Sequence, residues 1–211
     1  MKLPLGAFSW ILVWTALSGS GPLHGAEKPK VRVLDPFNHL DPRTVLVRNV
    51  SAKVVSHPDP AHHRVLEIRA DFANPEAWYY LQKNFPPGTI QPAKHTAVRF
   101  FVRSDSATVV SLQLMSADRE KLEAQGKSGI YFRLVEAGPS WTEVVVPLSE
   151  FKTAGMKLWK NGAQVVLPAL EPIPEGNLAR IGAVQWVFDV NRRGTSTVAH
   201  LQVEGLGLVE K

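Results

Sequence analysis

Polar and aromatic side chains alternate with apolar ones along four segments of this sequence, at residues 98–103, 109–115, 130–135 and 184–189. The side chains concerned are Arg99, Arg103, Gln113, Tyr131, Arg133, Gln185 and Asp189. Guanidinium and amide groups can hydrogen-bond a polyhydroxylated ligand, and an exposed ring can stack on its apolar face. If the four segments are neighbouring strands of one sheet, these side chains form one continuous ligand-binding surface. The same pattern also fits the ordinary solvated face of an antiparallel sheet.

The aromatic cluster in "AWYYLQKNF" adds a candidate for stacking on a ligand. In an extended strand Trp78 and Tyr80 point to one face, whereas Tyr79 and Leu81 point to the other. One of these faces must be core, so only one of Trp78 and Tyr79 is expected to be exposed, and Trp78 is the ligand-binding candidate. Trp141 follows a Gly-Pro turn and opens an alternating segment, and we expect it to be a packing residue.

Motifs that would indicate catalysis or a metal centre are weak. The histidines of "SHPDPAHHR" (His57, His62 and His63) lie in a Pro-rich polar loop without a fixed ligand spacing, and we expect them to be solvated. Ser149 and Lys152 match the S-x-x-K spacing of a nucleophile and its base, but the companion motifs S-D-N and K-T-G are absent from the sequence. No dense acidic motif suggests the carboxylate pair of a glycosidase. The sequence therefore predicts a protein that is not an enzyme.

The elements that must position these side chains are strands. Short runs rich in Val, Ile, Leu, Phe and Tyr are bounded by Gly, Pro, Asn and Asp, which is typical of strands and turns. The predicted strands are 31–35, 49–56, 64–72, 77–85, 96–105, 108–116, 129–136, 141–148, 183–191 and 198–210. Asn161-Gly162 predicts a hairpin over 157–167, and 116–126 predicts one or two helical turns within a loop. About ten strands without βαβ alternation predict an all-β fold, an antiparallel β-sandwich of the jelly-roll type.

The order and spacing of several of these segments resemble a known fold family. The segments are "VLDPF", "VLEIRADF", "AVRFFVRSD", "YFRLVEAGPSWTEVVVPLSEF", "IGAVQWVFDV" and "LQVEGLGLVE". Over residues 31–209 the chain resembles the galactose-binding-domain-like jelly rolls, and among these the bacterial carbohydrate-binding modules and the complex I intermediate-associated protein family. The resemblance implies a two-sheet jelly roll whose concave face often binds glycans.

The resemblance also implies a structural Ca²⁺ between the first and last strands, with Asp35 and Glu204 as its acidic ligands. The sequence departs from the family pattern at this point. Glu204 stands where an Asp is usual, Gly205 follows where a polar residue is usual, and "DPFN" lacks an acidic residue after Phe37. Ca²⁺ takes six to eight oxygen ligands, and the sequence offers two carboxylates. No other cofactor is expected.

The first residues are typical of an export signal. Lys2 precedes an uncharged apolar stretch, Leu5–Leu17, and small residues follow up to Ala26. The apolar stretch is shorter than the roughly 20 residues that cross a bilayer. We therefore expect a cleaved signal peptide at 1–26, a single domain at 27–211 and a secreted or periplasmic protein that is not an integral membrane protein. The chain has 211 residues, no cysteine and a formal net charge of +5 without a block of like charge, which argues against nucleic acid as a partner.

These observations support two functional hypotheses from different classes. The first is an exported, non-catalytic module that binds a polysaccharide or glycan-bearing surface through the polar face of the jelly roll. The second is a structural or assembly module that contacts another exported protein through the same sheet. A jelly-roll hydrolase or lyase is a third alternative, which the missing catalytic motifs disfavour.

Overall fold

The structure of the chain is a computed structural model. The structure describes residues 29–211 except for Pro60 and residues 74–77, 156, 161–162, 167–169 and 189–197. The predicted signal peptide, the Asn161-Gly162 turn and Asp189 lie outside the described residues. Within the described part, no helix is long and apolar enough to span a bilayer.

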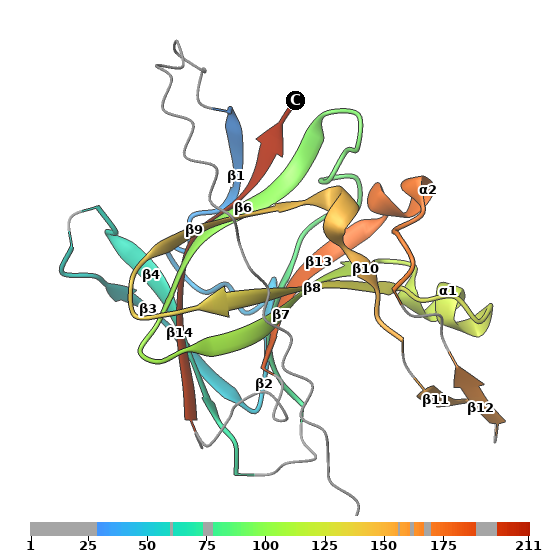
Figure 1. Cartoon of the computed structure of the whole chain (residues 1–211), viewed down its shortest axis with the longest axis horizontal. Coiled ribbons are helices and arrows are strands. Elements are labelled where there is room, and N and C mark those ends of the chain that lie inside the picture. Colours follow the sequence, from blue (N-terminus) through green and yellow to red (C-terminus); the bar gives the residue numbers. More distant parts are fainter. Residues whose placement is uncertain are drawn as a thin grey trace, which may run out of the picture.

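Two antiparallel sheets of six strands each form the body of the protein (Figure 1). The first, sheet A, has the order β3-β4-β14-β6-β9, and β1 also pairs with β14. Its strands are β1 (Val31–Asp35), β3 (Val50–Ser56), β4 (Arg64–Asp71), β6 (His95–Ser104), β9 (Thr142–Pro147) and β14 (Val198–Glu210).

The second, sheet B, has the order β10-β8-β7-β13-β5-β2. Its strands are β2 (Val45–Arg48), β5 (Tyr79–Asn84), β7 (Thr108–Ser116), β8 (Ile130–Ala137), β10 (Lys152–Thr153) and β13 (Ile181–Phe188). The strands β11 (Lys157–Lys160) and β12 (Ala163–Val166) pair with each other as the predicted hairpin and project from the body in Figure 1. The short helices are α1 (Arg119–Ala124), η1 (Leu148–Glu150) and α2 (Glu175–Leu178). The strands β2 and β10 and the helix α2 were not predicted from the sequence pattern, because all three are short.

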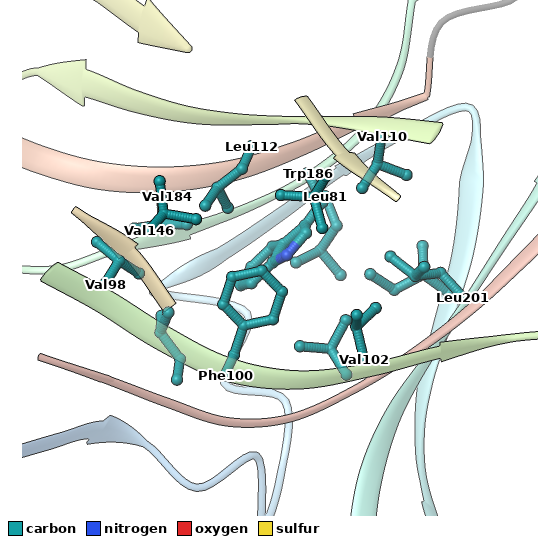
Figure 2. Close-up of a cluster of buried hydrophobic side chains, with 14 of the residues drawn as sticks. Leu81, Val98, Phe100, Val102, Val110, Leu112, Val146, Val184, Trp186 and Leu201 are labelled. Atoms are coloured by element: carbon teal, nitrogen blue, oxygen red, sulfur yellow. The ribbon is translucent and has the colours of Figure 1, made fainter. Parts of the chain in front are cut away.

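The core lies between the two sheets and is built from the apolar row of each strand (Figure 2). Val98, Phe100 and Val102 of β6 are fully buried, as their alternation with the arginines predicted. Trp186 of β13 is also fully buried, and its ring meets the ring of Phe100 edge-on at 6.0 Å between centroids. Such edge-to-face pairs add to the energy of simple burial. The apolar rows therefore fix which face of each strand points outward.

A bulge in β14 keeps its second half in register with the core. The pairing of β14 with β6 shifts between Glu204 and Gly207, and Gly205 has a φ of +63°, a conformation that favours glycine. Beyond the bulge, Leu206 and Leu208 point inward and are fully buried. A Cβ added to Gly207 would approach a Val31 methyl group to 2.7 Å and the Arg32 carbonyl oxygen to 3.1 Å, so a larger residue at this position would force β1 to shift.

Candidate functional site

The predicted polar surface is divided between the two sheets. Arg99 and Arg103 lie on β6 of sheet A, whereas Gln113 and Gln185 lie on β7 and β13 of sheet B. Each pair points away from the core, because the residues that alternate with it are buried. The expectation that all four strands share one sheet is therefore wrong, and the arginines and the glutamines face opposite sides of the sandwich.

A cleft with a volume of about 300 Å³ opens on the outer face of sheet B. Its lining combines amide, aromatic, guanidinium and apolar side chains. The lining residues are Arg48, Trp78, Tyr80, Gln82, Gln113, Met115, Arg119, Ile130 and Gln185. Three of the predicted ligand-binding residues, Trp78, Gln113 and Gln185, lie in this cleft. We call it the sheet B cleft.

A row of three glutamines crosses the floor of the sheet B cleft. Gln185 is the direct cross-strand partner of Gln82 on one side and of Gln113 on the other. Direct cross-strand partners point to the same face, so the three amides lie next to one another on adjacent strands. Gln113 and Gln185 are buried at 9% and 6% exposure although they face outward, which places them at the bottom of a concave surface.

Hydrogen bonds between the amides hold this row in place. Gln185 Nε2 donates to Gln82 Oε1 at 3.2 Å, and Gln82 Nε2 donates to Asn84 Oδ1 at 2.6 Å. Gln113 Nε2 donates to Ser111 Oγ at 3.3 Å. The Oε1 atoms of Gln113 and Gln185 accept no hydrogen bond from a described residue. Neither oxygen is fully buried, so a ligand can reach both. The floor therefore offers pre-positioned acceptors to a ligand hydroxyl.

The aromatic rings of Trp78, just before β5, and of Tyr80, within β5, form one wall of the cleft. Tyr79 and Leu81 are in the core at 2% and 0% exposure, so Trp78 and Tyr80 point to the cleft side. Trp78 is 52% exposed, and Asn49 Nδ2 donates a hydrogen bond of 2.8 Å to its backbone oxygen. The alternation read from the sequence predicted that Trp78 and Tyr79 lie on opposite faces, and Trp78 is the exposed one. An indole that is held at its backbone and half exposed is suited to stacking on a sugar ring.

Two arginines complete the rim of the sheet B cleft. Arg48, the last residue of edge strand β2, pairs in register with Tyr80. Arg119 begins helix α1, and its Nε bonds Glu123 Oε1 at 2.5 Å. Sequence reasoning missed Arg48, Gln82 and Arg119. The alternation of Tyr80 and Gln82 with core residues could have revealed Gln82, whereas no local pattern brings Arg48 and Arg119 to one cleft.

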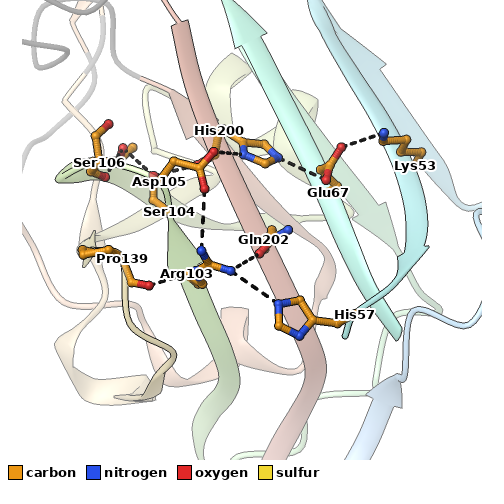
Figure 3. Close-up of polar contacts among 11 residues, drawn as sticks. Lys53, His57, Glu67, Arg103, Ser104, Asp105, Ser106, Pro139, His200 and Gln202 are labelled. Atoms are coloured by element: carbon orange, nitrogen blue, oxygen red, sulfur yellow. Dashed lines mark hydrogen bonds and ion pairs between the residues drawn. The ribbon is translucent and has the colours of Figure 1, made fainter. Parts of the chain in front are cut away.

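Both arginines of β6 already have partners on the outer face of sheet A, and Figure 3 shows those of Arg103. Arg103 Nε donates to the Pro139 carbonyl oxygen at 2.8 Å, and Arg103 Nη1 donates to Gln202 Oε1 at 3.4 Å. Arg99 pairs with Glu143, and its guanidinium lies 4.9 Å from the centroid of the Phe101 ring. These contacts leave both arginines in a structural role on this face.

A second part of the sheet A network joins three strands and a loop through His200 (Figure 3). His200 Nδ1 lies 2.5 Å from Asp105 Oδ2, and His200 Nε2 lies 3.3 Å from Glu67 Oε2. Lys53 Nζ contacts Glu67 Oε1 at 2.9 Å. Burial by itself would raise the pKa of Glu67, but the hydrogen bond from Lys53 and the charge of His200 outweigh it and lower that pKa. The network therefore links β3, β4 and β14 electrostatically.

Tyr131 and Arg133 do not lie on the outer face of sheet B, which corrects the alternation assigned to β8. Tyr131 pairs with the core residue Leu114 and is fully buried. Its hydroxyl donates to the Ser128 carbonyl oxygen at 3.2 Å and accepts from Asn177 Nδ2 at 2.8 Å. These partners satisfy the polar end of the ring, so the tyrosine can be buried. Burial raises the pKa of Tyr131.

Arg133 shares the inner face of β8 with Tyr131 but leaves the sandwich at its edge. The neighbouring strand β10 pairs only with Phe132 and Tyr131, so it does not cover Arg133. The guanidinium reaches outward instead, and its Nε lies 3.1 Å from Glu150 Oε2 of η1. Arg133 is therefore exposed at the edge of the sandwich, away from the glutamine row.

Asp35 and Glu204 do not form one calcium site. Asp35 pairs with the core residue Leu206 and points between the sheets, where Lys83 Nζ lies 2.6 Å from Asp35 Oδ2. Glu204 points to the outer face of sheet A and contacts His62. The two carboxylates thus lie on opposite sides of sheet A, and an ammonium group already neutralises the inner one. No cluster of three or more His, Cys, Asp or Glu side chains with metal-binding geometry occurs among the described residues. The residues present do not fit the implied Ca²⁺.

The histidine loop covers Trp141 on the outer face of sheet A. The His62 ring stacks on Trp141 at 4.3 Å between centroids, and the His57 ring meets it edge-on at 5.4 Å. The expectation that these two histidines are solvated is therefore wrong. Trp141 packs as expected, although its contacts are histidine rings rather than the main core. It is not available as a stacking platform.

Comparisons with solved structures support the fold. No family model matches the chain, and no curated protein matches it. The family 11 carbohydrate-binding module of a cellulosomal cellulase of Clostridium thermocellum aligns with a TM-score of 0.57 at 14% identity, over 88% of this chain and 97% of the module. A family 11 module from the same organism, in complex with a β-1,3-1,4-mixed-linked tetrasaccharide, aligns with a TM-score of 0.58 at 16% identity, over 85% of this chain and 95% of that chain.

An exo-β-agarase also contains this fold. It aligns with a TM-score of 0.58 at 10% identity, over 85% of this chain and 25% of the agarase chain. At such low identities the likeness concerns the fold. The predicted jelly-roll sandwich, of the kind found in carbohydrate-binding modules, is confirmed.

Proposed function

We propose that this protein is an exported, non-catalytic carbohydrate-binding module and that the sheet B cleft is its binding site. The observation that carries the proposal is the row Gln82, Gln185 and Gln113 on the cleft floor beside the rings of Trp78 and Tyr80. Solved modules of the same fold, one of them in complex with a tetrasaccharide, add support.

The cleft offers both kinds of contact that a glycan requires. Its amides can donate to and accept from hydroxyl groups, and the hydrogen-bond chain from Gln185 to Asn84 orients them before a ligand arrives. Trp78 presents an apolar ring to a pyranose face. A volume of about 300 Å³ is at the lower end of the range for small-molecule sites, which suits a short stretch of a glycan chain.

We infer binding rather than hydrolysis from the chemistry of the lining. The nine described lining residues include amides, rings and guanidinium groups but no carboxylate. Glycosidases use a pair of carboxylates that flank the scissile bond. The proposal also includes export through a signal peptide at residues 1–26 and a secreted or periplasmic location, in keeping with the apolar start of the chain.

Affinity gel electrophoresis with a panel of polysaccharides tests the proposal. We expect at least one polysaccharide to retard the wild-type protein and the variant Trp78→Ala to lose about tenfold in affinity. The estimate follows from burial of roughly 100 Å² of ring at about 25 cal/mol per Å², with part of that free energy offset by the cost of ordering the ligand. Gln185→Leu, which keeps the side-chain volume, should weaken binding as well.

Val145→Ala is the matched control for this experiment. Val145 is 49% exposed, close to the 52% of Trp78, but it lies on β9 in the opposite sheet. The control should bind as the wild type does. Failure of every polysaccharide to retard the wild type, or equal retardation of Trp78→Ala and Val145→Ala, would overturn the proposal.

The alternative function, docking onto another exported protein, would use the outer face of sheet A. Val33 and Val145 are exposed there on either side of Arg99 and Gly207 in one cross-strand row. A partner captured from an envelope extract that is lost with Val145→Glu but retained with Trp78→Ala would favour this function.

A further inference from the structure

We propose that the sheet B cleft selects glycans that carry anionic groups, uronate or sulfate, and that Arg48 is the residue that recognises the negative charge. This inference rests on the proposed function and names its ligand class. The inference is drawn from the positive charge of the side chains that line the cleft. A binding site for a neutral glycan would not need that charge.

The described lining of the cleft is cationic. It contains Arg48 and Arg119 and no aspartate or glutamate. A hydroxyl-rich neutral ligand gains from carboxylate acceptors, which form the stronger, charge-assisted hydrogen bonds. Here the acceptors in the floor are neutral amides, whereas Arg48 on the rim carries a positive charge that no described carboxylate neutralises. This distribution favours a ligand that brings acceptors with negative charge.

Two of the three carboxylates in and next to helix α1 are already paired, and the third, Glu120, is exposed and is not among the residues that line the cleft. Glu123 bonds Arg119, and Asp118 Oδ2 lies 2.6 Å from Arg180 Nε. The hydrogen bond from Arg180 holds the pKa of Asp118 below its usual range. Neither carboxylate is therefore free to neutralise Arg48 across the cleft.

Arg48 itself is free to bind a ligand. It is exposed, and its side chain makes no ion pair or hydrogen bond with any residue that the structure describes. In contrast, each of several other arginines has a carboxylate partner: Arg99, Arg103, Arg119, Arg133 and Arg180. A guanidinium fork matches the two oxygens of a carboxylate or sulfate group. Its position beside Tyr80 would place that anion at the edge of a stacked sugar ring.

Positive charge continues along the same face of sheet B on the other side of the glutamine row. Phe132 is the cross-strand partner of Gln113, and Lys152 is the partner of Phe132. Lys152 therefore shares the face of the cleft, one strand beyond Phe132. Its Nζ is tethered only loosely, at 3.5 Å from the Ser149 carbonyl oxygen. A chain laid across the sheet from Arg48 to Lys152 would meet cations near both ends, which suits a repeating polyanion.

Titration calorimetry with defined polysaccharides tests this inference. The probes are polygalacturonate for uronate, carrageenan for sulfate, and mixed-linkage β-glucan and agarose as neutral chains. We expect at least one anionic probe to bind about tenfold more tightly than the neutral ones, a preference that shrinks as salt is added. Arg48→Gln should lower the affinity for the anionic probe to that for the neutral chains. The two anionic probes distinguish carboxylate from sulfate recognition.

Arg69→Gln is the matched control for the change in net charge. Arg69 is exposed on β4 of sheet A, and the substitution removes one positive charge far from the cleft. If Arg48→Gln and Arg69→Gln lose affinity for the anionic probe to the same extent, the binding reflects only the general attraction of a basic protein for polyanions. That result would overturn the inference. Equal or tighter binding of neutral chains would also overturn it but leave the proposed function standing. Binding of none of the four probes would overturn the inference, and a similar failure across the whole panel would overturn the proposed function.

Discussion

Replacing Lys83 by methionine should leave an unpaired negative charge between the two sheets and destabilise the fold. Lys83 pairs in register with Val184, a core residue, so its side chain points inward from β5. There its Nζ lies 2.6 Å from Asp35 Oδ2 and donates to Thr44 Oγ1 at 2.9 Å. Methionine keeps the apolar stem of the side chain but removes the charge and both contacts.

The expected size of the loss follows from the burial of the pair. The side chains of Lys83 and Asp35 are 15% and 11% exposed. Removal of one partner from a fully buried ion pair costs about 3–5 kcal/mol, and the remaining exposure lets water solvate part of the stranded carboxylate. We therefore expect the free energy of unfolding to fall by about 2–4 kcal/mol. Asp35 also accepts a hydrogen bond of 2.7 Å from the backbone N–H of Phe37, whose positive φ of 52° depends on such support.

Urea unfolding followed by tryptophan fluorescence measures this loss. Lys53→Met is the control, because Lys53 forms an ion pair of similar length with Glu67 while remaining 68% exposed. Its loss should stay below about 1 kcal/mol. The double variant Lys83→Met, Asp35→Asn should be more stable than the two single changes predict by addition, since no unpaired charge remains.

The prediction is wrong if Lys83→Met lowers the free energy of unfolding no more than Lys53→Met does. It is also wrong if the effects of Lys83→Met and Asp35→Asn are additive. Calcium offers a second check on the same pair. Because an ammonium group occupies the carboxylate of Asp35, we expect Ca²⁺ to leave the unfolding midpoint of the wild type unchanged. A rise of the midpoint with Ca²⁺ would show that Asp35 belongs to a cation site.

Two further predictions concern buried titratable groups. Burial, followed by the charge of Arg32, lowers the pKa of His95 from its ordinary value of 6.5; the unfolded chain therefore binds more protons, and stability should fall as the pH drops below about 6.5. In His95→Asn, whose Oδ1 can still accept from the backbone N–H of Gln91, unfolding midpoints measured from neutral to mildly acidic pH should vary less. Tyr131→Phe removes the hydroxyl that accepts from Asn177, and urea unfolding should show a loss of about 1 kcal/mol; an unchanged free energy of unfolding would mean that this hydrogen bond makes no net contribution to stability.

Much of the fold was predictable from local patterns. The alternation in β6 predicted that Val98, Phe100 and Val102 are core, and the alternation in β5 predicted that Trp78 and Tyr79 face opposite sides. Both predictions are confirmed, because neighbouring side chains of a strand must point to opposite faces whatever the strand pairs with.

The same argument failed for β8, where both rows are largely apolar. Tyr131 and Phe132 are each suitable for the core, and the choice was decided by the pairing of Tyr131 with Leu114 and by partners for its hydroxyl at Ser128 and Asn177. These partners come from a loop and a helix that no strand pattern reveals. Hydrophobicity alone could not decide the orientation of this strand.

Only part of the candidate site could be predicted from the sequence, for a similar reason. Gln113 and Gln185 were chosen correctly as outward-facing residues, but Arg99 was grouped with them although it lies on the other sheet. Arg48 and Arg119 reach the cleft from an edge strand and a helix that are short and far apart in the chain.

The sequence by itself determined where the strands lie and which side of most of them is apolar, because both properties depend on residues a few positions apart. Only the tertiary structure decided which strands share a sheet, and hence which polar rows meet. That choice depends on pairing between distant segments, such as β14 with β6 or β13 with β7, and is set by packing of the whole core. The separation of the arginines of β6 from the glutamines of β7 and β13 is the direct consequence.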